Sequence, residues 1–178
     1  MGKLVKRVKG QKRGDLTDIF NNLGFTKGAE VGVEKGNFSE FLCNKMPNAT
    51  IYCIDVWKRY DGDHGYKHQK NYIAARDRLE KCPNAIIIKD LSVNVYKQFP
   101  KNTFDFVYID SNHDFDYVME DIIGWSRVVK KGGYICGHDY MKYKTIQVME
   151  AVDAYVTSHN IETLYLTDER KPTWYFIK

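Results

Sequence analysis

Residues able to bind a charged ligand occur together in the first third of the chain. Two acids and two glycines share the stretch EVGVEKG: Glu30, Gly32, Glu34 and Gly36. A dinucleotide-binding turn would have glycine at position 34, where its backbone must approach a pyrophosphate. A carboxylate there repels phosphate and attracts positive charge, such as a sulfonium or an ammonium group. The stretch therefore favours a cationic ligand over a dinucleotide.

Two further acids have the character of nucleoside contacts. Asp55, followed by Val56, can accept both hydrogen bonds of a ribose diol. Asp90, followed by Leu91, can accept a hydrogen bond from the exocyclic amine of adenine. Each signal also has a structural interpretation, in which the glycines only form a tight turn and the acids only cap the segments after them. Their succession along the chain favours a binding site.

Alternating strands and helices must position these residues. Predicted strands cover residues 29–33, 50–55, 85–89, 104–109 and 133–136, and predicted helices cover 15–23, 37–46, about 66–81, 115–129 and 144–159. This alternation predicts an α/β fold with a parallel sheet and helices on both faces. Segments 161–166 and 173–177 flank a polar turn and predict a hairpin, so the last strand should be antiparallel. Ligands of such sheets bind beyond the carboxyl ends of the strands, where the acids lie.

Two longer motifs complete the pattern: FDFVYID, which ends at Asp110, and GGYICGHDY, which contains His138 and Asp139. Together with E-x-G-x-x-x-G and the strand-end Asp55, their order over residues 28–140 resembles the class I S-adenosylmethionine-dependent methyltransferases. The small-molecule O-methyltransferase branch is the most similar. This resemblance implies a Rossmann-like sheet of seven strands, mostly parallel, with the last strand antiparallel.

The resemblance also implies a cofactor site. The glycine-containing stretch would hold the methionine end of S-adenosylmethionine, Asp55 the ribose, and Asp90 would approach the adenine. The predicted cofactor-binding residues are Glu30, Gly32, Glu34, Gly36, Asp55, Val56, Asp90, Leu91 and Asp110.

By the same resemblance, a divalent ion, Mg²⁺ or Mn²⁺, would bind Asp110, His138 and Asp139 and lower the pKa of an acceptor hydroxyl. The sequence departs from the pattern, because His138 replaces a second Asp and Asn112 replaces an acidic base. We expect His113 to be the substitute base, with Asp110 as the second catalytic residue. Hydrogen bonding within the strand-end loops is the alternative role of both histidines.

Composition limits the class of protein. No stretch approaches the ~20 apolar residues of a membrane-spanning helix, and no apolar block follows the basic N-terminus, so we expect neither a membrane protein nor a secretory signal. The four cysteines stand singly, which suits reduced thiols and a cytoplasmic location. Residues 1–13 carry six basic side chains and no acid and are predicted to be a flexible tail before one domain at 14–178. Attraction to polyanions is the less favoured role of this tail.

We therefore expect an enzyme that methylates a hydroxyl of a small molecule or sugar, using S-adenosylmethionine. The alternatives are an NAD- or nucleotide-sugar-binding protein, which Glu34 opposes, a nucleic-acid methyltransferase, and a non-catalytic relative. No N-P-P-Y-like or Pro-Cys motif follows the fourth strand, so a nucleic-acid partner is not expected. A homo-oligomer stays open. Residues 58–66 are predicted to cover the cofactor or line the acceptor pocket, with a solvated loop as the alternative.

Overall fold

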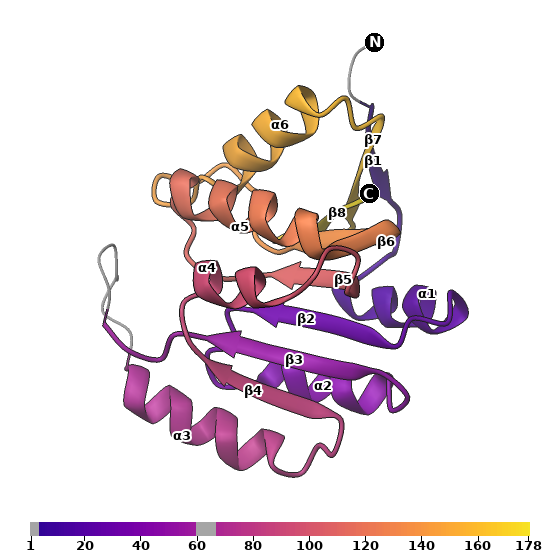
Figure 1. The fold of residues 1–178 in the computed structure, drawn as a ribbon. Helices are drawn as coiled ribbons and strands as arrows, with labels where there is room; N and C mark the ends of the chain where they lie inside the picture. Colours follow the sequence, from indigo (N-terminus) through magenta and orange to yellow (C-terminus); the bar gives the residue numbers. More distant parts are fainter. Residues whose placement is uncertain (1–3, 60–66) are drawn as a thin grey trace.

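The computed structural model describes residues 4–59 and 67–178 and contains one eight-stranded sheet (Figure 1). The predicted covering loop at 58–66 lies almost wholly outside the described residues. The sheet order is β1-β7-β8-β6-β5-β2-β3-β4. The strands are β1 (Leu4–Val8), β2 (Lys27–Val31), β3 (Thr50–Asp55), β4 (Ala85–Lys89), β5 (Phe104–Ile109), β6 (Val129–Gly137), β7 (Thr163–Thr167) and β8 (Trp174–Ile177).

The strand directions confirm the predicted mostly parallel sheet. The last strand, β8, runs antiparallel to both of its neighbours, β6 and β7, and the remaining pairs are parallel. The order reverses at β2 and β5, which are neighbours although β3 and β4 lie between them in sequence. Ligands of parallel sheets bind at such a reversal, beyond the carboxyl ends of the strands.

The prediction of seven strands was wrong by one, and the extra strand lies in the segment expected to be a flexible tail. Residues 4–8 form β1, which pairs in parallel with β7 from Leu4 beside Thr163 to Val8 beside Thr167. Most side chains of this edge strand are exposed. Backbone hydrogen bonds hold such a strand without an apolar face, and LVKRV has no alternation of apolar and polar residues that would predict a strand.

Helices cover both faces of the sheet (Figure 1). Helices α4, α5 and α6 pack on one face, and α1, α2 and α3 pack on the other. Their bounds are α1 (Leu16–Asn22), α2 (Asn37–Lys45), α3 (His68–Leu79), α4 (Ser92–Val95), α5 (Phe115–Val128) and α6 (Val148–Ser158), with short 3-10 turns at Arg13–Asp15 and Tyr96–Gln98. None of the helices within the described ranges is long and apolar enough to span a membrane.

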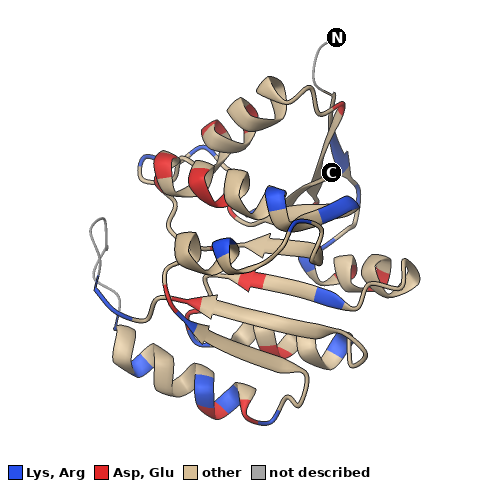
Figure 2. Cartoon of the chain, viewed as in Figure 1, with Lys and Arg blue, Asp and Glu red and all other residues tan. Residues whose placement is uncertain are grey.

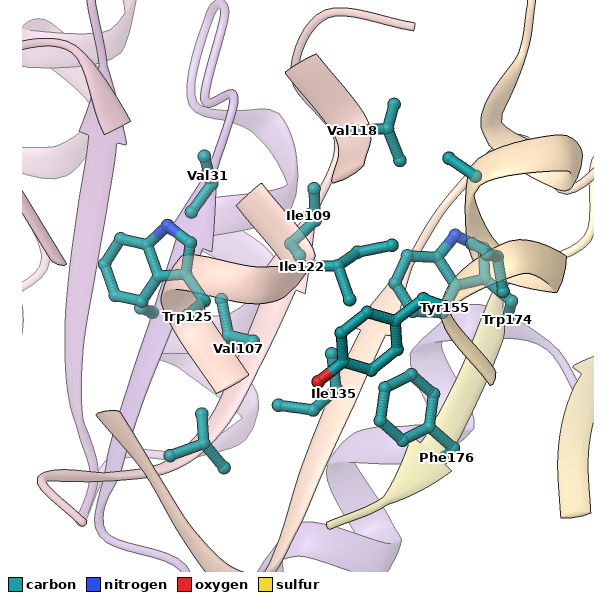
Figure 3. Packing of buried hydrophobic residues seen from close by; sticks show 14 of the residues in the cluster. Val31, Val107, Ile109, Val118, Ile122, Trp125, Ile135, Tyr155, Trp174 and Phe176 are labelled. Carbon is teal, nitrogen blue, oxygen red and sulfur yellow. The ribbon is translucent and has the colours of Figure 1, made fainter. Parts of the chain in front are cut away.

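The central strand β5 separates two apolar cores. All six of its residues are buried, and alternate side chains enter opposite layers. Val107 and Ile109 pack beneath α5 beside Trp125 (Figure 3), whereas Phe106 and Tyr108 pack against the α1 and α2 layer. This double burial fixes where β5 ends, and therefore where Asp110 begins the loop that faces the cavity.

A candidate active site at the carboxyl ends of the strands

A cavity of about 730 Å³ lies beyond the carboxyl ends of β2, β3, β4 and β5. It contains most of the residues predicted to bind a cofactor, although they come from four separate strand ends. Those that line it are Gly32, Glu34, Asp55, Val56, Asp90, Leu91 and Asp110. Glu30 and Gly36, which were predicted with them, do not line it. The cavity therefore joins the turn after β2 to the ends of the next three strands.

The turn after β2 brings the backbone close to β5. Gly32 has a φ of 93°, and a Cβ at this position would lie 2.1 Å from the carbonyl oxygen of Asp110. Only glycine permits this approach. Gly36, with a φ of 77°, precedes α2 and contacts Ala75 of α3 instead of the cavity. The two glycines thus have different roles. Gly32 lets the turn after β2 approach the end of β5 at the cavity, and Gly36 lets the start of α2 pack against α3.

Glu30 lies on the opposite face of β2, beneath α2. It is 2% exposed, and the hydroxyl of Ser39 donates a hydrogen bond to its carboxyl group. Burial raises the pKa of Glu30 to about 8, although the bond from Ser39 acts in the other direction. Because side chains alternate along a strand, Glu30 faces the α2 layer, whereas its neighbours Ala29 and Val31 face the layer of α5. Glu30 thus lies outside the lining of the cavity, and its contact with the methionine end stays a prediction.

Asp55 connects the β3 end to the turn after β2. Its Oδ2 accepts a hydrogen bond from the backbone N–H of Glu34 at 2.8 Å, and its Oδ1 accepts one from Trp57 at 2.9 Å. Burial raises the pKa of Asp55. Each carboxylate oxygen can accept a second bond, so these contacts orient Asp55 and leave acceptor capacity facing the cavity.

Asp90 at the β4 end is oriented by its own loop. Its Oδ1 accepts hydrogen bonds from Asn94 at 3.0 Å and from the backbone N–H of Leu91 at 2.7 Å. The bond from Asn94, followed by that from Leu91, lowers the pKa of Asp90. The negative charge of this cavity-lining carboxylate is thereby favoured.

Asp121 of α5 is a cavity residue that the sequence patterns missed. It is buried, and it accepts hydrogen bonds from the hydroxyl groups of Ser92 and Ser111, the latter at 2.6 Å. The Trp125 indole N–H in turn donates to Ser92 at 2.8 Å. Burial raises the pKa of Asp121 to about 6. No motif in the sequence identified Asp121, although its spacing of four from Trp125 places both on one side of α5.

Asp110, His113 and Asp139 form a cluster at the other end of the cavity. One ligand atom from each residue lies within 4.8 Å of the other two. His113 Nε2 lies 3.4 Å from Asp139 Oδ2 and 3.7 Å from Asp110 Oδ1. The polar interaction with Asp110 raises the pKa of His113, although burial opposes it. The cluster therefore combines one imidazole with two carboxylates.

His138 takes a different place from the one predicted. Its Nδ1 lies 3.4 Å from Asp139 Oδ1 and 3.9 Å from Asp110 Oδ2, but the residue does not line the cavity. Burial raises the pKa of Asp139, but contacts with His138 and Lys171 outweigh it and hold that pKa at about 2. The structure thus brings His113 to the cavity beside both carboxylates and leaves His138 behind them.

The donor set of this cluster fits a divalent cation. His113 Nε2 and Asp139 Oδ1 are buried and make no hydrogen bond within the described ranges. Two carboxylates and one imidazole suit Mn²⁺, Fe²⁺ or Zn²⁺, and the carboxylates alone suit Mg²⁺. Lys171 brings a second source of positive charge, because its Nζ lies 3.2 Å from Asp139 Oδ1. No pattern in the sequence identified Lys171.

Comparisons with known proteins agree on one family. A family model described as a methyltransferase domain matches residues 29–140, which is more than half of the chain. A search of curated proteins found no match.

Solved structures show the same fold at low sequence identity. A candidate caffeoyl-CoA O-methyltransferase from Staphylococcus aureus has a TM-score of 0.71 at 9% identity, covering 96% of this chain and 85% of that chain. An O-methyltransferase from Bacillus cereus in complex with S-adenosylhomocysteine has a TM-score of 0.68 at 13% identity, covering 96% and 82%. A precorrin-6y C5,15-methyltransferase from Geobacter metallireducens has a TM-score of 0.66 at 16% identity, covering 96% and 90%. Because the family model matches more than half of the chain, the chain belongs to the methyltransferase-domain family.

Proposed function

We propose that this chain uses S-adenosylmethionine to methylate a hydroxyl oxygen of a small molecule or sugar. The observation that carries the proposal is the single cavity that joins acidic strand ends to the cluster of Asp110, His113 and Asp139. One end has the acceptors that a nucleoside requires, and the other has groups able to take a proton from a hydroxyl. Family membership and the fold support methyl transfer.

Four residues at the cofactor end of the cavity have the charge or the hydrogen-bond capacity to contact different parts of S-adenosylmethionine. Asp55 would hold the ribose diol, and Asp90 and Leu91 would approach the base. Glu34, which lines the cavity beside Gly32, gives this end the negative charge that a sulfonium favours and a pyrophosphate does not. This charge supports S-adenosylmethionine over the alternatives NAD and a nucleotide sugar.

His113 is the group that would accept the hydroxyl proton. Its Nε2 is buried and makes no hydrogen bond to any residue that the structure describes, and the two carboxylates beside it would stabilise the imidazolium that forms. When bound, S-adenosylmethionine supplies an electrophilic methyl group, and a divalent cation lowers the pKa of the hydroxyl. Asp110, His113 and Asp139 would hold that cation, in which case His113 is a ligand and the proton leaves to solvent.

Ligand binding tests the cofactor. S-adenosylhomocysteine should raise the melting temperature, because a ligand that binds only the native state stabilises it. Asp55→Ala should lose most of this rise. Asp77→Ala, which removes an exposed carboxylate paired with Arg76, should retain it. A rise with NAD but none with S-adenosylhomocysteine would overturn the proposal.

Chelation tests the metal separately from the cofactor. If a divalent ion is required, EDTA should abolish methyl transfer and leave S-adenosylhomocysteine binding intact, and calorimetry should show Mn²⁺ binding that Asp139→Asn removes. If transfer is complete in excess EDTA, the metal is not used. His113→Gln should then abolish transfer, because the unaided imidazole is the base.

A further inference from the structure

Four basic residues lie on the two loops that contribute lining residues to the acceptor end of the cavity. Lys142 and Lys144 lie on the loop between β6 and α6, and Arg170 and Lys171 lie on the turn between β7 and β8. We call these four residues the cationic rim. All four are exposed, and Figure 2 shows basic residues on the β6–α6 loop beside the start of α5. Lys171 itself lines the cavity.

Backbone hydrogen bonds hold the two loops beside the proton-accepting cluster. The N–H of Tyr140 donates to the carbonyl of Pro172 at 3.1 Å, which joins the β6–α6 loop to the hairpin turn. At the other end of the loop, the N–H of Gln147 donates to the carbonyl of His113 at 2.8 Å. Thr145 and Ile146, which follow Lys144, line the cavity. The rim is therefore built onto the same loops that present His113 and Asp139.

Nearby acids offset part of the charge of the rim, since Lys171 Nζ lies 3.2 Å from Asp139 Oδ1. The β6–α6 loop contains no acid at residues 140–147. The acids of the hairpin turn keep their negative charge, but they face the N-terminal segment. Asp168 Oδ1 lies 4.0 Å from Arg7 Nη1, the carboxylate of Asp168 accepts from the N–H of Gly10 at 3.0 Å, and Glu169 accepts from that of Arg13 at 2.7 Å. On α6, Asp153 accepts the hydroxyl of Tyr140 at 2.6 Å. Across the described ranges, Lys142, Lys144 and Arg170 form no ion pair.

The interior of the cavity has the opposite charge. Asp110, Glu120 and Asp139 line it, and Asp139 is only 4% exposed. An anionic group deep in this space would be repelled, whereas the same group at the mouth would lie beside Lys171 and the two loops that carry the other three cations. A neutral acceptor would gain nothing from the rim.

We propose that the acceptor carries a carboxylate or phosphate group that binds the cationic rim while its hydroxyl reaches His113. This inference rests on the proposed function and narrows its substrate class to anionic hydroxylated small molecules. The rim would select by charge at the mouth, and the acidic interior would exclude the anionic end of the molecule from the reacting centre. Binding would thus orient the acceptor with its hydroxyl inward.

Anion binding can be measured without turnover. Inorganic phosphate and acetate are titrated into the protein loaded with S-adenosylhomocysteine, and amide NMR shifts are followed at constant ionic strength. We expect saturable shifts confined to residues 140–147 and 168–172, with phosphate and acetate distinguishing the two anion classes. Lys142→Gln/Lys144→Gln/Arg170→Gln should abolish them. Lys81→Gln/Lys101→Gln/Arg127→Gln removes three exposed charges away from the cavity and should not. Absence of saturable shifts, or equal shifts in both variants, overturns the inference.

Matched acceptors test selection in the reaction. Dihydroxybenzoate is compared with dihydroxybenzamide, and glucose 6-phosphate with glucose. Transfer should favour the anionic member of one pair, with about a tenfold loss of kcat/KM in the rim variant and a KM that rises with salt. Equal use of charged and neutral members would overturn the inference and leave the proposed function standing. Anion binding at the rim with no binding of S-adenosylhomocysteine would overturn the proposed function, and with it the assignment of the anion to a methyl acceptor.

Discussion

The carboxyl group of Glu30 is placed to affect folding more than ligand contact. It lies 2% exposed beneath α2, and burial raises its pKa from 4.5 to about 8. A carboxyl with a raised pKa binds its proton more tightly in the folded state than in the unfolded state. Its contribution to stability is therefore complete below pH 4.5 and is lost as the pH rises through about 8.

Glu30→Gln should reduce this pH dependence, because the amide fills the same space and does not titrate. The pKa difference corresponds to at most about 5 kcal/mol between pH 4.5 and pH 9. Urea unfolding at pH 5, 7 and 9 measures it: the wild type should lose more stability with rising pH than the variant. Glu162→Gln, at an exposed position, should behave as the wild type. Parallel curves for wild type and Glu30→Gln would contradict the prediction.

Gly32 is the residue on which the shape of the cavity depends. Gly32→Ala would place a Cβ 2.1 Å from the Asp110 carbonyl oxygen at a φ of 93°. We expect a loss of about 3 kcal/mol or more in the free energy of unfolding, and loss of S-adenosylhomocysteine binding. Gly24→Ala is the matched control. It also has a positive φ, but a Cβ added there would have no atom within 4 Å, so it should cost about 1 kcal/mol and keep ligand binding. Similar losses in both variants would show that steric contact at Gly32 is not the cause.

At the scale of elements, strands with strong end signals were predicted to the residue. The bounds of β3, β4 and β5 match the predicted 50–55, 85–89 and 104–109. Each is an apolar run that ends next to a polar turn, and such runs have little freedom to shift register. By contrast, α4 is four residues long, and β6 begins at Val129 through the polar stretch KKGG, four residues before its predicted start. Short helices and polar strand ends are fixed by tertiary contacts that no local pattern contains.

The candidate site shows the same division. The sequence predicts its acids at strand ends, because the alternation of strands and helices shows where each strand stops. Seven of the nine predicted cofactor-binding residues line one cavity. The choice between the two histidines was not predictable, because it depends on loop conformation. Asp139, which follows His138, adopts a φ of 55°, and strand alternation gives no sign of such a turn. Lys171 reaches Asp139 only because the β7–β8 hairpin returns to this edge of the sheet.

Asn84 joins α2 to β4, and its replacement tests how elements are held together. Its side-chain amide donates to the carbonyl oxygens of Cys43, Met46 and Ala49, at 3.2, 3.1 and 2.9 Å. Asn84→Ala should lower the free energy of unfolding by about 1–3 kcal/mol, because these carbonyls lose a donor. Urea denaturation measures the loss, and S-adenosylhomocysteine binding should persist, since Asn84 does not line the cavity. Gln98→Ala removes one hydrogen bond, donated by an exposed side-chain amide to the carbonyl of Asn94, and should change the free energy of unfolding by about 0.5 kcal/mol or less. Equal effects would refute a joining role.

At the scale of the molecule, the N-terminal segment supports the end of the sheet farthest from the cofactor. β1 covers the edge of β7, and both chain ends lie at this side of the sheet (Figure 1). The carbonyl of Gln11 accepts the N–H of Asp168 at 2.7 Å, and the side chains of Asp168 and Glu169 bind the backbone of residues 10 and 13. The segment thus holds the turn that carries Lys171. A region whose charge indicated a detached tail is part of the support for the acceptor end.

Deletion of residues 1–13 should therefore affect the two ends of the cavity differently. The deletion removes the pairing of β1 with β7 and three hydrogen bonds to the hairpin turn, made by the backbone of residues 10, 11 and 13. At about 1 kcal/mol for each of these three bonds, we expect the free energy of unfolding to fall by at least about 3 kcal/mol. S-adenosylhomocysteine binding should persist in the folded fraction, because none of residues 4–13, the described part of the segment, lines the cavity. Anion binding at the cationic rim should weaken, because Lys171 loses its fixed turn. Lys6→Gln/Lys9→Gln is the control, since it removes two charges and keeps the backbone of the strand. If this charge variant reproduced the deletion, the positive charge rather than β1 would be what the segment contributes. If the deletion left urea unfolding and anion binding unchanged, the segment would have no supporting role.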